Sequence, residues 1–296
     1  MTRRLFAALA LLPIALAAQD STAAKSALLA ADRAAFANAD ALGTALDARA
    51  AVLLPGHDIL VGRRAWTSQL DDIVKAAGTL PGASPTHAVV SRDARFGCTT
   101  GVLHRVAADT TQPRTGRYAA CWRRERDGTW RLLALSRAYA PHQVAALPDS
   151  LPGAPGSAAE TAPRGAQPSL EMANADRAFA QFSADSGGPS GAFARWIAAD
   201  GMMLGSRAVP VRGSDQARAA FANFPNDGRF EWGPVDSLTV AARDGSLGFT
   251  VGQARIAATP KDVSYSKYLT IWRREGDGRY RFVFDIGSDR PAPRTP

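Results

Sequence analysis

The sequence has few of the residues that most often carry metal or nucleophilic chemistry. Its 296 residues include two cysteines and four histidines. They show no CxxC, HxH or HExxH spacing, which excludes the common zinc motifs. The chain also lacks a P-loop, a GxGxxG turn and a GxSxG elbow, the usual signs of nucleotide binding and of serine hydrolases. We therefore expect no metal and no cofactor.

Lysine is scarce as well, and arginine carries the basic charge. The chain has 35 Lys and Arg residues against 27 Asp and Glu residues, a formal charge of +8. A basic protein can bind nucleic acid. Here the arginines are scattered or lie beside hairpin turns among acidic residues, and no basic run forms a tail. The pattern favours a solvated basic surface and no nucleic-acid partner.

No apolar run is long enough to span a bilayer, which takes about 20 residues. Arg3 and Arg4 precede an apolar run from Leu5 to Leu16, and Ala15-Leu16-Ala17 fits the small-x-small cleavage pattern. These features predict a signal peptide over residues 1–18 and an exported protein, periplasmic or extracellular. The alternative is that the run forms a buried N-terminal helix.

The sequence contains an internal duplication. Residues 116–131 recur as 266–281, and residues 93–101 recur as 244–252. Each copy opens on a third shared segment, Ala31-Asp32-Arg33-Ala34 in one and Ala175-Asp176-Arg177-Ala178 in the other. Three matches in the same order predict two domains, over residues 21–147 and 169–290. The Pro-, Gly- and Ala-rich stretch 148–168 between them is typical of a linker.

Both copies predict helices followed by antiparallel strands, an α+β order. In the first copy we expect helices over 21–38, 42–49 and 63–77 and strands over 85–91, 95–106, 117–125 and 129–137. In the second copy we expect helices over 170–184, 191–198 and 213–224, a short strand over 202–204 and β segments over 229–241, 246–257, 264–274 and 279–287. Such a sheet must cover its apolar face by curling over the helices.

Two repeated motifs carry a resemblance to a known family. One is the strand beginning at Asp244, with Asp-(Gly/Ala)-x-(Leu/Phe)-Gly-(Phe/Cys)-Thr-x-Gly, and the other is the hairpin Tyr-x-x-x-Trp-Arg-Arg-Glu-x-Asp-Gly-x-(Trp/Tyr)-Arg. Both copies resemble the SnoaL-like/DUF4440 branch of the NTF2-like superfamily. The resemblance implies two tandem cone-shaped domains, each a curved antiparallel sheet wrapped around three helices, with a pocket at the open end. The superfamily includes isomerases, cyclases, dehydratases and proteins of no known activity, so it does not fix a function.

The resemblance also bears on assembly, because the exposed sheet face of this fold is commonly a dimer surface. A duplicated chain can supply both halves of such a contact itself. We therefore expect an intramolecular pseudo-dimer or a homodimer through the sheet faces.

The two copies differ where a pocket is expected. Asp285 lies in the last strand of the second copy, and the first copy has Leu135 at the aligned position. An apolar cavity with a few polar groups is the usual small-molecule site. We predict that domain 2 binds a small apolar or amphipathic molecule, and that domain 1 is mainly structural. The predicted lining is Trp196, Met203, Trp232, Tyr268 and Asp285.

Two other interpretations of these residues stay open. Asp285 is the candidate catalytic base of an isomerase-, hydrolase- or lyase-type enzyme, or it merely caps the sheet edge. Asp200 is interpreted as a turn residue, and the His57-Asp58 pair as part of a solvated loop.

The two cysteines fall on strands that should be neighbours. If Cys98 and Cys121 face each other directly, the turn between their strands centres near residues 108–111, inside the expected loop. Opposed residues have Cβ atoms about 4.5–5.5 Å apart, near the spacing of a disulfide. We predict a Cys98–Cys121 disulfide, with two buried free thiols as the alternative.

Overall fold

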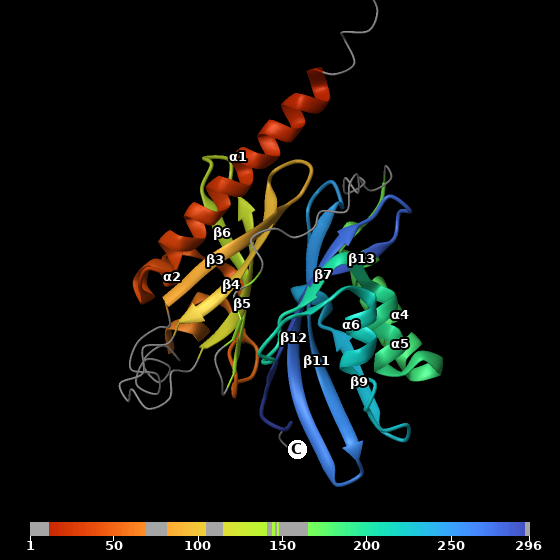
Figure 1. Ribbon diagram of the computed structural model, residues 1–296. Helices are drawn as coiled ribbons and strands as arrows, with labels where there is room; N and C mark the ends of the chain where they lie inside the picture. Colours follow the sequence, from red (N-terminus) through yellow and green to blue (C-terminus); the bar gives the residue numbers. More distant parts are fainter. Residues whose placement is uncertain are drawn as a thin grey trace, which may run out of the picture.

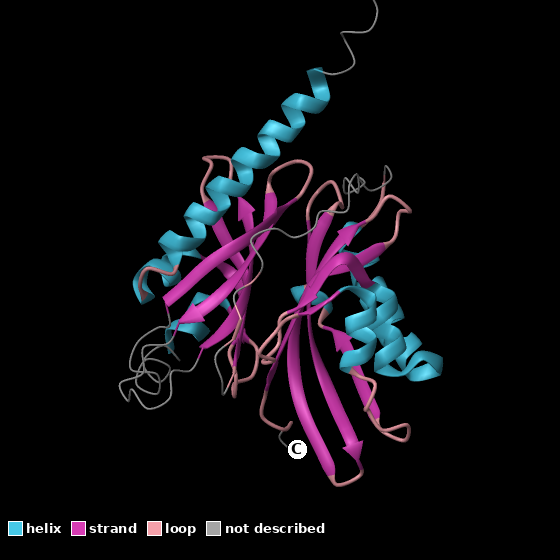
Figure 2. Cartoon of the chain, in the orientation of Figure 1, coloured by secondary structure: helices cyan, strands magenta, loops and turns pink. Residues whose placement is uncertain are grey.

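The computed structural model of the protein describes residues 12–68, 82–104, 115–140, 144–145, 147 and 165–293. These residues form two α+β domains, each with a curved sheet that carries helices on one face (Figures 1 and 2). Residues 1–11 of the expected leader and most of the expected linker lie outside the described residues.

Domain 1 holds a six-stranded sheet in the order β2-β1-β6-β5-β4-β3. A further helical segment begins at residue 62, and its expected end at residue 77 lies outside the described residues. The elements with printed bounds are helices α1 (Leu12–Ala35) and α2 (Ala39–Ala45) and strands β1 (Leu46–Leu53), β2 (Leu60–Val61), β3 (Gly82–Val90), β4 (Phe96–His104), β5 (Thr115–Arg124) and β6 (Trp130–Tyr139).

Domain 2 repeats this plan with the sheet order β10-β11-β12-β13-β7-β8, and β9 pairs with β11 beside β10. Its helices are α4 (Pro168–Phe182), α5 (Gly188–Trp196) and α6 (Gly213–Ala220), with a π turn over Ser183–Gly187. Its strands are β7 (Ile197–Met203), β8 (Val211–Arg212), β9 (Arg229–Pro234), β10 (Val240–Ala241), β11 (Leu247–Thr259), β12 (Asp262–Arg274) and β13 (Tyr280–Asp289).

The expected antiparallel strands are confirmed, and each sheet also contains one parallel pair that was not predicted. The expected helix over 42–49 ends at residue 45, and β1 then runs parallel to β6. In domain 2, β7 begins at Ile197 and runs parallel to β13. The cause is an apolar run, Ala50 to Leu54, whose alternate side chains enter the cores on the two faces of the sheet. Such double burial is typical of a strand inside a sheet.

Two expected details of the strands of domain 2 are also wrong. The segment over 229–241 is not one strand, because β9 ends at Pro234, whose ring nitrogen has no hydrogen to donate to the ladder. The alternate spacing of Phe282, Phe284 and Ile286 predicts that they share one face of the strand, but they do not. A bulge beside Trp272 shifts the register, so Phe282 faces the helices while Phe284 and Ile286 face domain 1.

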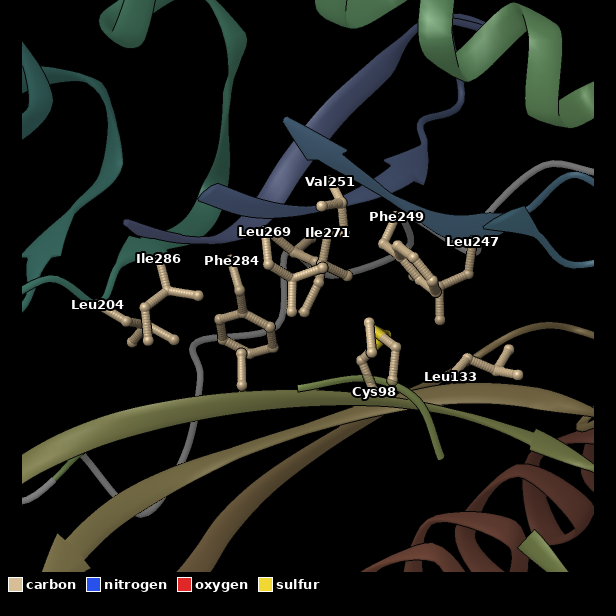
Figure 3. Close-up of a cluster of buried hydrophobic side chains, with 14 of the residues drawn as sticks. Cys98, Leu133, Leu204, Leu247, Phe249, Val251, Leu269, Ile271, Phe284 and Ile286 are labelled. Carbon is tan, nitrogen blue, oxygen red and sulfur yellow. A yellow bond between two sulfur atoms is a disulfide. The ribbon is translucent and has the colours of Figure 1, made fainter. Parts of the chain in front are cut away.

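The two sheets pack face to face, with the helices on the outer sides (Figure 2). A single apolar cluster joins them, and the Phe96 and Phe249 rings meet in it at a centroid distance of 6.2 Å. Figure 3 shows Phe249, Leu269, Ile271 and Phe284 pointing from domain 2 toward the strands of domain 1. Each sheet therefore buries the face that carries no helices against the other domain.

Polar contacts also join the two domains at this interface. Arg117 on β5 is fully buried, and its guanidinium donates to the carbonyl oxygens of Gly205, Arg207 and Ala208 in domain 2, at 3.3, 2.7 and 2.8 Å. The matching residue in domain 2, Lys267, donates to the carbonyl oxygen of Asp289 at 2.6 Å. Burial lowers the pKa of Lys267 to about 8. The two equivalent residues therefore act differently, because Arg117 donates across the interface whereas Lys267 donates within domain 2.

Cys98 and Cys121 lie directly opposite each other on β4 and β5 and form a disulfide. Both are fully buried in the cluster between the domains, where Figure 3 shows the sulfur atoms beneath Phe249 and Ile271. Phe249 and Ile271 are the residues of domain 2 at the positions that match Cys98 and Cys121. The disulfide therefore fills the place of an apolar pair, and we find no reactive thiol within the described ranges.

Candidate functional site: an aromatic pocket in domain 2

A buried carboxylate lies at the centre of domain 2. Asp176 on α4 is 1% exposed, and the Tyr268 hydroxyl donates to its two oxygens at 3.1 and 3.2 Å. Thr250 and Trp232 also hydrogen-bond to this carboxylate. The indole nitrogen of Trp272 in turn donates to the Thr250 hydroxyl at 2.9 Å. The network fastens the first helix of the domain to three strands of the sheet.

Domain 1 contains the same network at the matching positions. Asp32 on α1 accepts hydrogen bonds from the Tyr118 hydroxyl, at 2.7 Å, and from Thr99. The indole nitrogen of Trp122 donates to Thr99 at 3.1 Å. Sequence reasoning used the Ala-Asp-Arg and Tyr-x-x-x-Trp repeats to find the duplication but missed this role. The signal was an aspartate repeated at the same place in the first helix of each copy.

Burial changes the acidity of both carboxylates. It raises the pKa of Asp176 to about 7 and that of Asp32 to about 6, against the stabilising effect of their hydrogen bonds. Burial and the neighbouring carboxylates also raise the pKa of Tyr118 and Tyr268 well above the ordinary value. Each tyrosine therefore stays protonated at neutral pH and remains a hydrogen-bond donor.

A small pocket of about 70 Å³ lies beside this network in domain 2. Asp285 reaches it from β13 and accepts a hydrogen bond from Thr270 at 2.6 Å. Burial raises the pKa of Asp285 to about 6, against the effect of the Thr270 hydrogen bond. The wall is otherwise mainly apolar and aromatic. Its residues are Phe179, Phe193, Phe230, Trp232, Ala254, Ser266, Tyr268, Thr270, Asp285 and Gly287.

Three of the five predicted ligand-binding residues line this pocket, namely Trp232, Tyr268 and Asp285. Trp196 does not line it; its ring stacks on Phe179 at 5.6 Å and borders a separate surface groove. Met203 is not a lining residue either. It lies on β7, where it pairs with Asp285 in the parallel ladder. Both side chains are partly buried against the core of domain 2, and the sequence does not show which residues of that core border the void.

Other candidates from the sequence lie away from the pocket. Asp200 is on β7 rather than in a turn, and both of its oxygens accept hydrogen bonds from Arg273 at 2.7 and 2.9 Å. The loop holding His57 lies against the end of β13, where Asp58 pairs with Arg290 at 3.2 Å. Trp66 and Trp122 are fully buried in domain 1.

Sequence reasoning missed the phenylalanine rings of the pocket. Phe179 and Phe193 come from α4 and α5, and their ring centroids are 4.8 Å apart. Phe230 lies on β9, with its ring centroid 5.0 Å from that of Trp232. Helical spacing predicts that Phe179 is buried, but no sequence pattern shows which of these rings border a void.

The matching region of domain 1 has different residues. Strand register aligns Leu135 with Asp285 and Ala120 with Thr270. It also aligns Ala83 with Trp232, because these residues pair with Leu103 and Ala254. Domain 1 thus keeps the buried network but has neither the second carboxylate nor the tryptophan of the pocket.

The described ranges also bear on two other functions, metal binding and membrane insertion. Within those ranges no three His, Cys, Asp or Glu side chains lie close enough together to hold a metal ion. None of the described helices is long and apolar enough to cross a membrane.

Comparison with solved structures finds proteins of the NTF2-like and ketosteroid-isomerase-like kind. A putative ketosteroid isomerase from Parabacteroides distasonis is 15% identical, with 38% of this chain and 83% of that chain covered and a TM-score of 0.31. A ketosteroid isomerase-like protein from Erwinia carotovora is 16% identical, with 42% and 96% covered and a TM-score of 0.33. An NTF2-like protein of unknown function from Pseudomonas putida is 15% identical, with 43% and 87% covered and a TM-score of 0.33. No protein-family model and no curated protein matches the sequence.

Proposed function

We propose that domain 2 binds a small molecule with an apolar body and one polar group, and that domain 1 is its structural partner. The observation that carries this proposal is the position of Asp285, a carboxylate with accessible surface at a pocket lined by aromatic rings. Thr270 occupies only one of the sites at which its oxygens accept hydrogen bonds. The remaining sites are available to a ligand.

The size of the pocket limits what enters it. A volume of about 70 Å³ is well below the several hundred Å³ usual for drug-sized ligands. The pocket therefore takes a small molecule or the end group of a longer one. The rings supply apolar contact and Asp285 orients the polar group.

The test compares Asp285→Asn with Leu135→Asn, the matched change in domain 1. The amide oxygen of the Asp285→Asn variant can still accept the Thr270 hydrogen bond, so the fold should be retained while ligand binding is lost. Leu135 is fully buried, so its replacement should lower the free energy of unfolding by roughly 2–4 kcal/mol and leave binding intact. Native mass spectrometry of the protein from its own source identifies a bound molecule. A molecule retained by Asp285→Asn, or one held by His57, Trp66 or Trp122, contradicts the proposal.

A second candidate is an enzyme of the isomerase, hydrolase or lyase type that uses Asp285 as its base. The observation in its favour is a carboxyl whose pKa, about 6, lies near physiological pH, as suits a general base. The Tyr268 hydroxyl borders the same pocket, but its hydrogen is directed to Asp176. If Asp285→Asn keeps the bound molecule but abolishes its turnover, the enzyme is supported; if it loses the molecule itself, the binding protein is supported.

We further propose that the mature protein is exported after removal of residues 1–18. The basic start and the apolar run that follows it support this proposal. Mass measurement of the protein from the culture medium or the periplasm should give a chain that begins at Gln19. An intact Met1 on the cellular protein would contradict export by this route.

A further inference from the structure

One residue of domain 1 occupies the place that is open in domain 2. Arg137 lies opposite Tyr118 in the β5–β6 ladder, and Gly287 lies opposite Tyr268 in the β12–β13 ladder. The two tyrosines belong to matching networks, so Arg137 and Gly287 are equivalent positions. Gly287 lines the pocket of domain 2. Domain 1 therefore extends a long cationic side chain from the position where domain 2 has none.

The surroundings of Arg137 show how this cone holds a cation. Its side chain is fully buried, and among the residues that the structure describes none accepts a hydrogen bond from its three guanidinium nitrogens. The guanidinium carbon lies 5.5 Å from the centre of the Phe36 ring, which is itself 5.0 Å from the Tyr118 ring. The charge of Arg137 also acts on Tyr118, the partner of Asp32. Domain 1 thus keeps a cation against an aromatic face, near the tyrosine that donates to Asp32.

The pocket of domain 2 has more aromatic rings and an additional carboxylate at the corresponding place, and no cation among its lining residues. Five aromatic side chains and Asp285 line its pocket, and no Lys, Arg or His is among the lining residues. A second carboxylate, Asp176, accepts the hydrogen bond of Tyr268 from behind the wall. Aromatic faces and carboxylates both attract a cation and disfavour an anion.

We propose that the pocket of domain 2 binds the cationic head of a small organic amine, an alkylammonium or guanidinium group, in the volume that corresponds to the Arg137 side chain in domain 1. This inference rests on the proposed function and narrows its ligand to a charge class. Asp285 accepts the hydrogen bond or faces the charge of the head group, and the Phe and Trp rings surround its apolar part.

The experiment uses three probes of one shape with the full-length protein: benzylammonium, benzyl alcohol and phenylacetate. Calorimetry measures binding, and a change in tryptophan fluorescence that is absent from a Trp232→Phe variant reports on the pocket. We expect benzylammonium to bind at least about tenfold more tightly than benzyl alcohol, because a charge-assisted hydrogen bond and the ring faces act only on the cation. Phenylacetate should not bind. Asp285→Asn should remove the preference for the cation.

Variants at position 287 locate the site. The backbone of Gly287 is not in the left-handed region, and an added Cβ would meet its nearest atom, the Lys267 carbonyl oxygen, at 3.7 Å. Gly287→Arg should therefore fold, fill the pocket as Arg137 does and abolish benzylammonium binding. Gly287→Met fills the same volume without charge and should also block it. Arg137→Met in domain 1 should leave binding unchanged.

Three outcomes overturn the proposal. Equal or tighter binding of benzyl alcohol shows a neutral site, which leaves the proposed small-molecule function standing. Absence of binding by all three probes at millimolar concentration removes the amine ligand, and the function then depends on the molecule identified from the source. Undiminished benzylammonium binding by a folded Gly287→Arg variant places the amine site elsewhere and removes this proposal, while the proposed function again depends on the molecule identified from the source.

Discussion

Replacement of Asp176 by asparagine should change how the stability of the protein depends on pH. The carboxyl of Asp176 has a pKa of about 7 in the fold, against an ordinary value of 3.8. Its proton is therefore held more tightly in the folded chain than in the unfolded chain. The stabilising contribution is complete below about pH 4 and is lost as the pH rises through 7.

The size of this effect follows from the difference in pKa. A difference of about 3 pKa units corresponds to about 4 kcal/mol of unfolding free energy between the protonated and ionised forms. Asp176 is 1% exposed, so solvent screens little of it. The side-chain amide of the Asp176→Asn variant does not titrate but still accepts the hydrogen bond of the Tyr268 hydroxyl. The difference in unfolding free energy between the natural protein and this variant should thus shift by about 4 kcal/mol between pH 4 and pH 8.

Urea denaturation followed by tryptophan fluorescence at several pH values measures this difference. Asp32→Asn is the matched variant in domain 1. Because the pKa of Asp32 is about 6, its shift should amount to about 3 kcal/mol and end about one pH unit lower. A constant difference between the natural protein and Asp176→Asn over this pH range would refute the reasoning.

Three further predictions concern the contact between the domains. The natural protein denatured without reductant should show no free thiol, and two free thiols would contradict the disulfide. The double variant Cys98→Ala, Cys121→Ala should lower the unfolding free energy by about 3 kcal/mol, because the disulfide closes a loop of about 23 residues. Arg117→Met should lower the free energy of unfolding by about 3 kcal/mol, because it leaves buried carbonyl oxygens of domain 2 without a donor. An unchanged unfolding midpoint would contradict the role of Arg117 in joining the domains. Light scattering should give the mass of one chain, because the helix-free face of each sheet is already covered by the other domain, and a stable dimer of the natural protein would contradict this use of the sheet faces. Phe249→Ala should lower the free energy of unfolding by about 3–5 kcal/mol, because Phe249 is buried between the domains.

The duplication made most of the fold predictable from the sequence. The repeated Tyr-x-x-x-Trp hairpin fixed the register of the two long strands in each domain, and the alternation of Tyr268, Thr270 and Trp272 on one face is as expected. The parallel strand β1 was not predictable in the same way. Its Ala-rich sequence has good helix propensity, and only burial on both faces makes it a strand. Tertiary contacts decided that segment.

The candidate site was predictable only in part, for a similar reason. Asp285 stood out because its aligned residue is Leu135, a difference in chemistry that a sequence shows directly. The phenylalanines of the pocket and the face of Phe282 depended on helix packing and on a bulge, neither of which leaves a local pattern. Asp176 was visible as a repeated residue, but its burial became clear only when α4 lay on the sheet.

The comparison of the two domains separates support from binding. Asp32 and Asp176 accept equivalent hydrogen bonds from a tyrosine and a threonine, although domain 1 has lost the aspartate and tryptophan that border the pocket of domain 2. Because both domains keep this hydrogen-bond network, we infer that its role is one that both still need, namely to hold the first helix against the curved sheet. The positions that differ, among them Asp285 and Gly287, are those that border the pocket. Variants of the shared network should therefore change stability in either domain, and variants of the differing positions should change binding in domain 2 alone.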